Sequence, residues 1–109
     1  MKQTNRSPLH TSFYGDTVRC TQQELEILYG KPQFSGNDGR GKINFEWTLE
    51  HNGKVITIYD MKHYRPLSPD ELIDWHIGGE NKMVTTEVAK HISDEIKSTF
   101  PTLFPRDNF

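Results

Sequence analysis

Residues 43–59 read Ile-Asn-Phe-Glu-Trp-Thr-Leu-Glu-His-Asn-Gly-Lys-Val-Ile-Thr-Ile-Tyr, and this stretch decides the fold. Its first eight residues alternate between apolar and polar side chains, which is the pattern of a strand with one buried face. Asn52-Gly53 is the favoured pair for a two-residue type I′ turn, and the β-branched run after it is typical of a second strand. We therefore predict an antiparallel hairpin with strands at about 43–51 and 54–61.

The two-residue turn fixes the register of the hairpin and gives it one apolar face. The predicted pairs are His51 with Lys54, Leu49 with Ile56, Trp47 with Ile58, and Phe45 with Asp60. Asp60 and Lys62 therefore interrupt the apolar face at its far end. A polar group in a buried position needs a partner, so this interruption is the main indication of function.

Three segments carry the marks of helices. Thr21 and Glu24 form a capping box, and Gly30 follows as a stop signal. Ser68 and Pro69 have the residue types of an N-cap and a first helical position. The longest segment has β-branched residues at four-residue intervals, so we expect it to cover the apolar face of the hairpin. The predicted helices span about 22–29, 69–74 and 82–99.

Glycines mark two further places along the chain. The segment 36–42 contains three glycines and is interpreted as a flexible loop. Gly78 and Gly79 would permit a sharp turn before the long helix. The expected fold class is α+β, with a hairpin packed by a C-terminal helix. We predict one domain at 13–100, a flexible N-terminal tail at 1–12 and a C-terminal tail at 101–109.

Composition excludes several function classes. The chain of 109 residues has a formal charge of −2, which disfavours bulk binding to nucleic acid. Its single cysteine, Cys20, excludes an internal disulfide or a zinc ribbon and fits a reducing compartment. No apolar run approaches the roughly 20 residues that span a bilayer, so no membrane association is expected.

The first candidate site is a polar corner where the hairpin end meets the entrance of the long helix. The amides of a helix N-terminus, with basic side chains beside them, can bind an anion, and an aromatic ring such as Trp75 can stack on a base. In an alternative interpretation, Asp60 pairs with His76 and Trp75 belongs to the core. The candidate ligand-binding residues are Asp60, Lys62, His63, Arg65, Trp75, His76, Gly78, Gly79 and Lys82.

A second interpretation is catalytic. Asp60 and Lys62 would share one face of a strand, as metal-dependent nucleases with an Asp-x-Lys motif require. Mg²⁺ needs a further acid, yet Glu46 is expected to point away, which leaves only Asp38 or Glu24. The five histidines show no ligand spacing. We therefore predict no catalytic residue, no metal site and no cofactor.

Four short segments follow one another along the chain: Gly30-Lys31-Pro32, Glu46-Trp47-Thr48-Leu49, Ile56-Thr57-Ile58-Tyr59-Asp60-Met61-Lys62 and Trp75-His76-Ile77-Gly78-Gly79. In this order they resemble a group of small uncharacterised proteins encoded by tailed bacteriophages. The resemblance covers about 28–97, and where that group often has Tyr-Asp-Tyr-Lys this chain has Met61 in the third position. It implies a phage origin without an activity.

Together these features favour a phage-encoded accessory binding protein of the host cytoplasm, acting in host takeover or against host defence. Its expected partner is a host protein or a phosphate-bearing, nucleotide-type small molecule. The sequence leaves open a Mg²⁺-dependent nuclease, a virion or assembly component, and self-association into a homo-oligomer.

Overall fold

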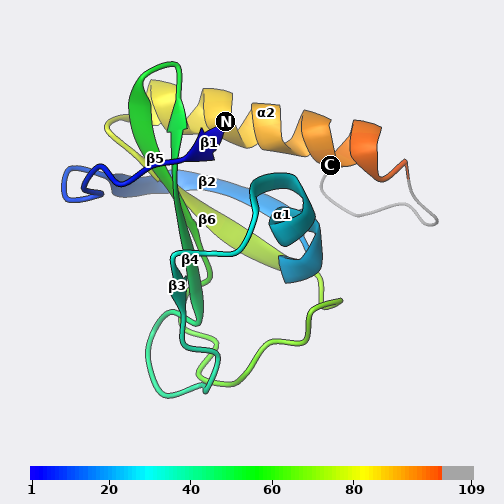
Figure 1. Ribbon diagram of the computed structural model, residues 1–109. Helices are drawn as coiled ribbons and strands as arrows, with labels where there is room; N and C mark the ends of the chain where they lie inside the picture. The colour runs from blue at the N-terminus through cyan, green and yellow to red at the C-terminus, as the bar shows by residue number, and fades with distance from the viewer. Residues whose placement is uncertain (102–109) are drawn as a thin grey trace.

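The computed structural model describes residues 1–101 and shows a six-stranded antiparallel sheet with two helices, an α+β fold (Figure 1). The sheet order is β1-β4-β5-β6-β2, and β3 also pairs with β4. Of the predicted C-terminal tail at 101–109, residues 102–109 lie outside the described residues. The elements are β1 (Lys2–Gln3), β2 (Ser12–Cys20), α1 (Gln22–Tyr29), β3 (Phe34–Ser35), β4 (Phe45–His51), β5 (Lys54–Tyr59), β6 (Ile73–Gly79) and α2 (Lys82–Thr99).

The β4–β5 hairpin has the predicted turn and register. Asn52 and Gly53 have φ values of 51° and 78°, as a type I′ turn requires. The ladder confirms His51↔Lys54, Leu49↔Ile56 and Trp47↔Ile58. It ends with Glu46↔Tyr59, so the predicted pair of Phe45 and Asp60 is wrong and the second strand is two residues shorter than expected. The side chain of Asp60 takes the place of a further backbone pair, as described below.

Two of the three predicted helices are confirmed with their bounds, and the third is wrong. Thr21 and Glu24 form the capping box of α1, and the side chain of Asn81 caps α2. Residues 69–74 are not helical: a turn precedes β6, which begins at Ile73. Burial alternates along β6, and this strand pairs with β5 and β2 on its two sides. Pairing on both edges outweighs a local capping signal.

Gly78 and Gly79 lie within β6 and make no turn, so the predicted sharp turn before the long helix is wrong. A Cβ atom on Gly78 would clash with the Thr57 hydroxyl, and one on Gly79 would lie 2.9 Å from Thr85 Cγ2 on α2. The two glycines therefore allow close approach on opposite faces of one strand.

The N-terminal segment, predicted as a tail at 1–12, contributes a short strand to the sheet. Lys2–Gln3 pairs with β4, and the Gln3 side-chain amide donates to the carbonyls of Tyr29 and Lys31 at 2.9 and 2.6 Å. Strand β2, which the sequence did not reveal, pairs with β6 along an irregular register. Only two of its nine residues are buried, so its apolar pattern is weak.

Both helices lie on the same face of the sheet. The indole of Trp47 donates to the carbonyl of Gly30 at 2.8 Å, which fixes β4 to the end of α1. The hydroxyl of Tyr29 donates to Glu95 Oε1 at 2.6 Å, which joins α1 to α2. Buried residues from all four long strands and both helices fill the space between the helices and the sheet. Among residues 1–101 no helix covers the opposite face, which we call the open face (Figure 1).

Candidate functional site

The nine sequence-predicted site residues do not form one cluster. Asp60, Lys62, His63 and Arg65 lie in the loop that joins β5 to β6, beside the Ile73 end of β6. Gly79 and Lys82 lie at the other end of that seven-residue strand, which is roughly 20 Å long at about 3.3 Å per residue. The helix entrance and the hairpin end are therefore separate places.

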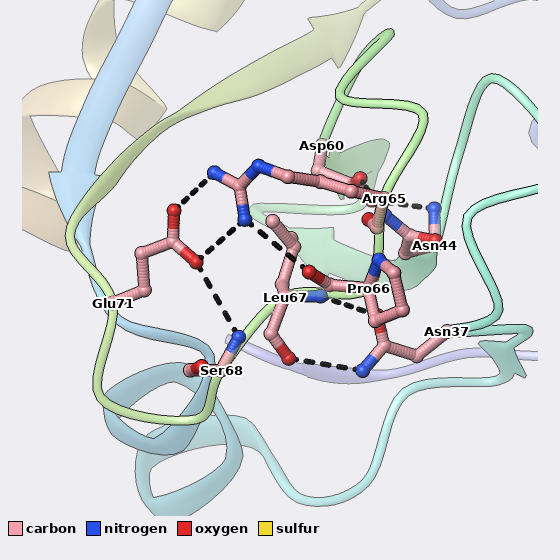
Figure 2. Close-up of polar contacts among 8 residues, drawn as sticks. All are labelled: Asn37, Asn44, Asp60, Arg65, Pro66, Leu67, Ser68 and Glu71. Carbon is pink, nitrogen blue, oxygen red and sulfur yellow. Dashed lines mark hydrogen bonds and ion pairs between the residues drawn. The ribbon is translucent and has the colours of Figure 1, made fainter.

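Asp60 is fully buried and its carboxylate is held by the chain itself (Figure 2). Its Oδ1 accepts the backbone N–H groups of Asn44 and Phe45, both at 2.8 Å, and its Oδ2 accepts the Asn44 side-chain amide at 3.0 Å. Three donors satisfy a buried carboxylate well. This supports a structural role for Asp60, which neither pairs with His76 by a hydrogen bond nor faces solvent.

Arg65 belongs to the same structural network. Its guanidinium forms a two-bond ion pair with Glu71, and Figure 2 shows the two side chains facing each other across the loop. The Asn37 side chain donates to the carbonyl of Leu67 at 3.0 Å and accepts its N–H at 2.7 Å. These contacts fasten the β3–β4 loop to the β5–β6 loop, so the glycine-rich segment is tied down at this point.

Two other candidates are also occupied. Trp75 is fully buried in the core, and its indole N–H donates to the carbonyl of Cys20 at 3.0 Å. Lys82 forms an ion pair of 3.1 Å with Asp16, whose carboxylate also accepts the hydroxyls of Thr85 and Thr86. The anion at the start of α2 is thus the chain's own Asp16.

Another candidate, His76, belongs to a transverse row on the open face. Strand register places Phe34 opposite Glu46, Glu46 opposite Tyr59, and Tyr59 opposite His76. Directly paired residues on antiparallel strands share a face, so these four side chains follow one another across β3, β4, β5 and β6. Phe13 of β2 stacks on His76, with ring centroids 4.0 Å apart and planes 17° apart. We call these five residues the open-face row.

Aromatic surface is accessible at both ends of the open-face row. Phe34 is 48% exposed and Phe13 is 42% exposed. Between them, the rings of Tyr59 and His76 have centroids 5.4 Å apart at an angle of 57°. The row therefore offers ring faces and edges in the middle of a sheet, where neighbouring strands fix their positions.

The titratable groups of the open-face row are perturbed by partial burial. Burial raises the pKa of the Glu46 carboxyl, which has no hydrogen bond or ion pair with any described residue. Burial and the nearby Glu46 carboxylate raise the pKa of Tyr59. Burial and then the charge of His63 lower the pKa of His76, against smaller opposing effects of Asp60 and Asp74. Within residues 1–101, Glu46 is a half-buried acid without a partner.

Positive side chains lie in the β3–β4 loop and the β5–β6 loop, at one end of the sheet. Lys42 comes four residues before Glu46, and Lys62 comes three residues after Tyr59. The backbone N–H of Lys62 donates to the carbonyl of Lys42 at 2.7 Å, and Figure 1 shows both loops together at the end farthest from α2. Arg40, Lys42 and Lys62 are exposed and form no ion pair with the described part of the chain. We call these three residues the loop cations.

A separate pocket of about 270 Å³ lies between the hairpin turn and residues 6–11. The arginine and the lysine that line it already form ion pairs, Arg6 with Glu50 at 3.0 Å and Lys54 with Glu80 at 2.7 Å. This pocket is therefore a poorer anion site than the loop cations.

The geometry required for the nuclease interpretation is not present. Strand β5 ends at Tyr59, and Lys62 has a φ of 59°, so Asp60 and Lys62 do not project from one strand face. Among residues 1–101 no group of three or more His, Cys, Asp or Glu side chains is arranged to hold a metal ion.

Sequence reasoning missed Phe13, Phe34, Glu46 and Tyr59 as site residues. Each looks like an ordinary strand residue in the sequence, and Glu46 had been assigned only to the face away from the core. The alternation in residues 43–50 contained this signal, because it places Glu46 on a face that nothing in the hairpin buries.

Comparison of the chain with protein-family models, with curated proteins and with solved structures finds no match. The phage resemblance therefore stays a prediction. No helix in the described part of the chain has the length and apolar character needed to span a bilayer.

Proposed function

We propose that the protein is a binding module that recognises a nucleotide on the open face of its sheet. The base stacks on the aromatic side chains of the open-face row, and the phosphate contacts the loop cations. The observation that carries this proposal is an aromatic row, exposed at both ends, on strands that run into the loops of three exposed cations. These cations form no ion pair with the described residues. In the phage setting that the sequence resemblance implies, such a module would sequester a host nucleotide.

The open-face row is suited to a base, and the loop cations are suited to a phosphate. Bases stack on aromatic side chains of open antiparallel sheets, and each stacked base contributes about 1–3 kcal/mol. Exposed lysines attract phosphate, with modest energies that fall as salt concentration rises. The overall charge of −2 argues for a small ligand at a local site and against a long polyanion.

A binding role fits the open-face row better than catalysis does. Tyr59 and His76 contact each other as rings and share no hydrogen bond, and Glu46 bonds to neither. A nucleophile and its base normally lie within hydrogen-bond reach. The row has the chemistry of recognition: flat apolar surfaces next to one acceptor group.

The experiment is isothermal titration calorimetry with a panel of mononucleotides and cyclic dinucleotides at low salt. We expect at least one nucleotide to bind, and Tyr59→Leu, which keeps apolar volume but removes the ring, to weaken binding roughly 5- to 150-fold. Absence of binding to every member of the panel, with a folded wild-type protein, would reject the proposed function.

The phosphate half is tested by charge removal. Lys42→Ala combined with Lys62→Ala should weaken nucleotide binding and reduce its dependence on salt. Lys90→Ala combined with Lys97→Ala is the matched control, because it also removes two positive charges from exposed side chains but lies on α2, which packs on the opposite face of the sheet. Equal effects of the loop variants and the control would show that the phosphate does not contact the loop cations.

A further inference from the structure

Glu46 is the one acidic group within the open-face row, and its surroundings favour a particular ligand edge. It lies on β4 between Phe34 of β3 and Tyr59 of β5, in direct register with both. Its carboxylate is half-buried and has no hydrogen-bond donor among the described residues. Leaving a partly desolvated carboxylate without donors is unfavourable, so a ligand that supplies donors gains from this position.

Other acids near this face already have partners. Glu50, four residues along β4 on the same face, accepts a hydrogen bond from Arg6 at 3.0 Å and another from Thr4 at 3.2 Å. Asp74 of β6 forms an ion pair with Arg19 at 3.4 Å. Glu46 therefore differs from its neighbours in having both oxygens available.

We infer that the open face selects a guanine base, whose two adjacent N–H donors bond to the two carboxylate oxygens of Glu46 while the ring stacks on Tyr59. This inference rests on the proposed nucleotide-binding function and names the base. Directly paired residues have Cβ atoms about 4.5–5.5 Å apart, so a base lying on Tyr59 reaches Glu46 with its edge.

The selection follows from the donors and acceptors of the bases. Guanine presents N1–H and the 2-amino group side by side, which matches an ionised carboxylate that can only accept. Adenine and cytosine present an amino group beside a ring-nitrogen acceptor, and uracil presents one N–H between two carbonyl oxygens. Each of these bases would place at least one acceptor against a carboxylate oxygen, which is repulsive.

The first test compares GMP, IMP and AMP by isothermal titration calorimetry with the wild-type protein. IMP keeps N1–H and lacks only the 2-amino group, so its binding should be roughly 10- to 150-fold weaker than that of GMP, as expected for one hydrogen bond to a charged group. AMP should bind more weakly than IMP, because an acceptor then faces the carboxylate.

The second test changes the acceptor pattern of the protein. Glu46→Gln offers one acceptor and one donor, a pattern that suits adenine, so the variant should lose its preference for GMP and bind AMP as well or better. Glu50→Gln is the matched control on the same strand and face, and it should leave the order of the nucleotides unchanged.

A thermal unfolding measurement tests whether misfolding causes any change in nucleotide preference of the Glu46→Gln variant. Because burial leaves the charged form of Glu46 unfavoured, Glu46→Gln should unfold at the same temperature as wild type or a higher one at pH 7.

The outcomes separate this inference from the proposed function. A preference for GMP that Glu46→Gln abolishes and Glu50→Gln retains supports the guanine assignment. Nucleotide binding without a preference for GMP over IMP and AMP, or with a preference that Glu46→Gln leaves intact, overturns the guanine assignment and leaves the proposed function standing. No binding of any nucleotide overturns both.

Discussion

Replacement of Asp60 by alanine removes the acceptor on which the junction of the two long loops depends. The substitution leaves three N–H donors without an acceptor: the backbone N–H groups of Asn44 and Phe45 and one N–H of the Asn44 side-chain amide. A buried donor that loses its partner costs about 1–3 kcal/mol, and the three effects are not fully additive. We expect Asp60→Ala to lower the free energy of unfolding by about 3–5 kcal/mol, a large share of the roughly 5–15 kcal/mol typical of a domain.

Asp60→Asn gives a graded comparison. Its carbonyl can still accept both backbone N–H groups, but its amide then faces the amide of Asn44, so two donors oppose each other. Asn44 cannot simply rotate, because its amide also donates to the carbonyl of Arg65 and its oxygen accepts the N–H of Gly39. We expect a loss of about 1–2 kcal/mol, which corresponds to one hydrogen bond.

Urea denaturation followed by tryptophan fluorescence measures both changes, because Trp47 and Trp75 are fully buried. Asp70→Ala is the control: this acid is exposed and unbonded within the described residues, so its replacement should change stability by less than about 0.5 kcal/mol. A loss below about 1 kcal/mol for Asp60→Ala, or equal losses for the two Asp60 variants, would refute the structural role.

Two further substitutions test the sheet. Gly78→Ala places a Cβ atom against the Thr57 hydroxyl and should destabilise the protein by about 1–3 kcal/mol in thermal denaturation. Adding Thr57→Ala should recover part of that loss, and no recovery would locate the strain elsewhere. The pKa of His76 is lowered by burial, so the unfolded chain binds more protons, and the stability that this group contributes above pH 6.5 is lost as pH falls through its folded pKa. His76→Gln should therefore reduce the loss of stability between pH 7.5 and 5, and an unchanged loss in urea titrations at both pH values would contradict this assignment.

The parts of the fold that sequence could predict are those whose signals are local. The hairpin register depends on Asn52-Gly53 and on alternation within one segment, and the start of α1 depends on Thr21 and Glu24, three residues apart. Strand β6 was predicted as helix and turn, because Ser68 and Pro69 imitate a helix start and the glycine pair imitates a bend. Its actual place depends on pairing with β5 and β2, which no local window contains.

The candidate site was harder to predict for the same reason. Of the nine expected residues, only His76 belongs to the open-face row, and Lys62 belongs to the loop cations beside it. The other members of the row come from β2, β3, β4 and β5, and their proximity depends on a strand order that brings distant segments together. As a polar residue on an apolar face, Asp60 was predicted to need a partner, and the backbone N–H groups of Asn44 and Phe45 supply it.

Asp60 and Glu46 show why a functional argument has to weigh the partners of a carboxylate as well as its burial. Asp60 is the more buried of the two, yet its carboxylate already accepts three hydrogen bonds from the chain and is not accessible to a ligand. Glu46 is only half-buried, yet it has no donor among the described residues. The bonds of Asp60 fasten the end of β5 to the start of β4, and the loops on either side carry Lys62 and Lys42. Asp60 therefore supports the two loops that carry the loop cations. A loss of Asp60 should weaken ligand binding by disturbing the fold, whereas a loss of Glu46 should change the choice of ligand and leave the fold intact.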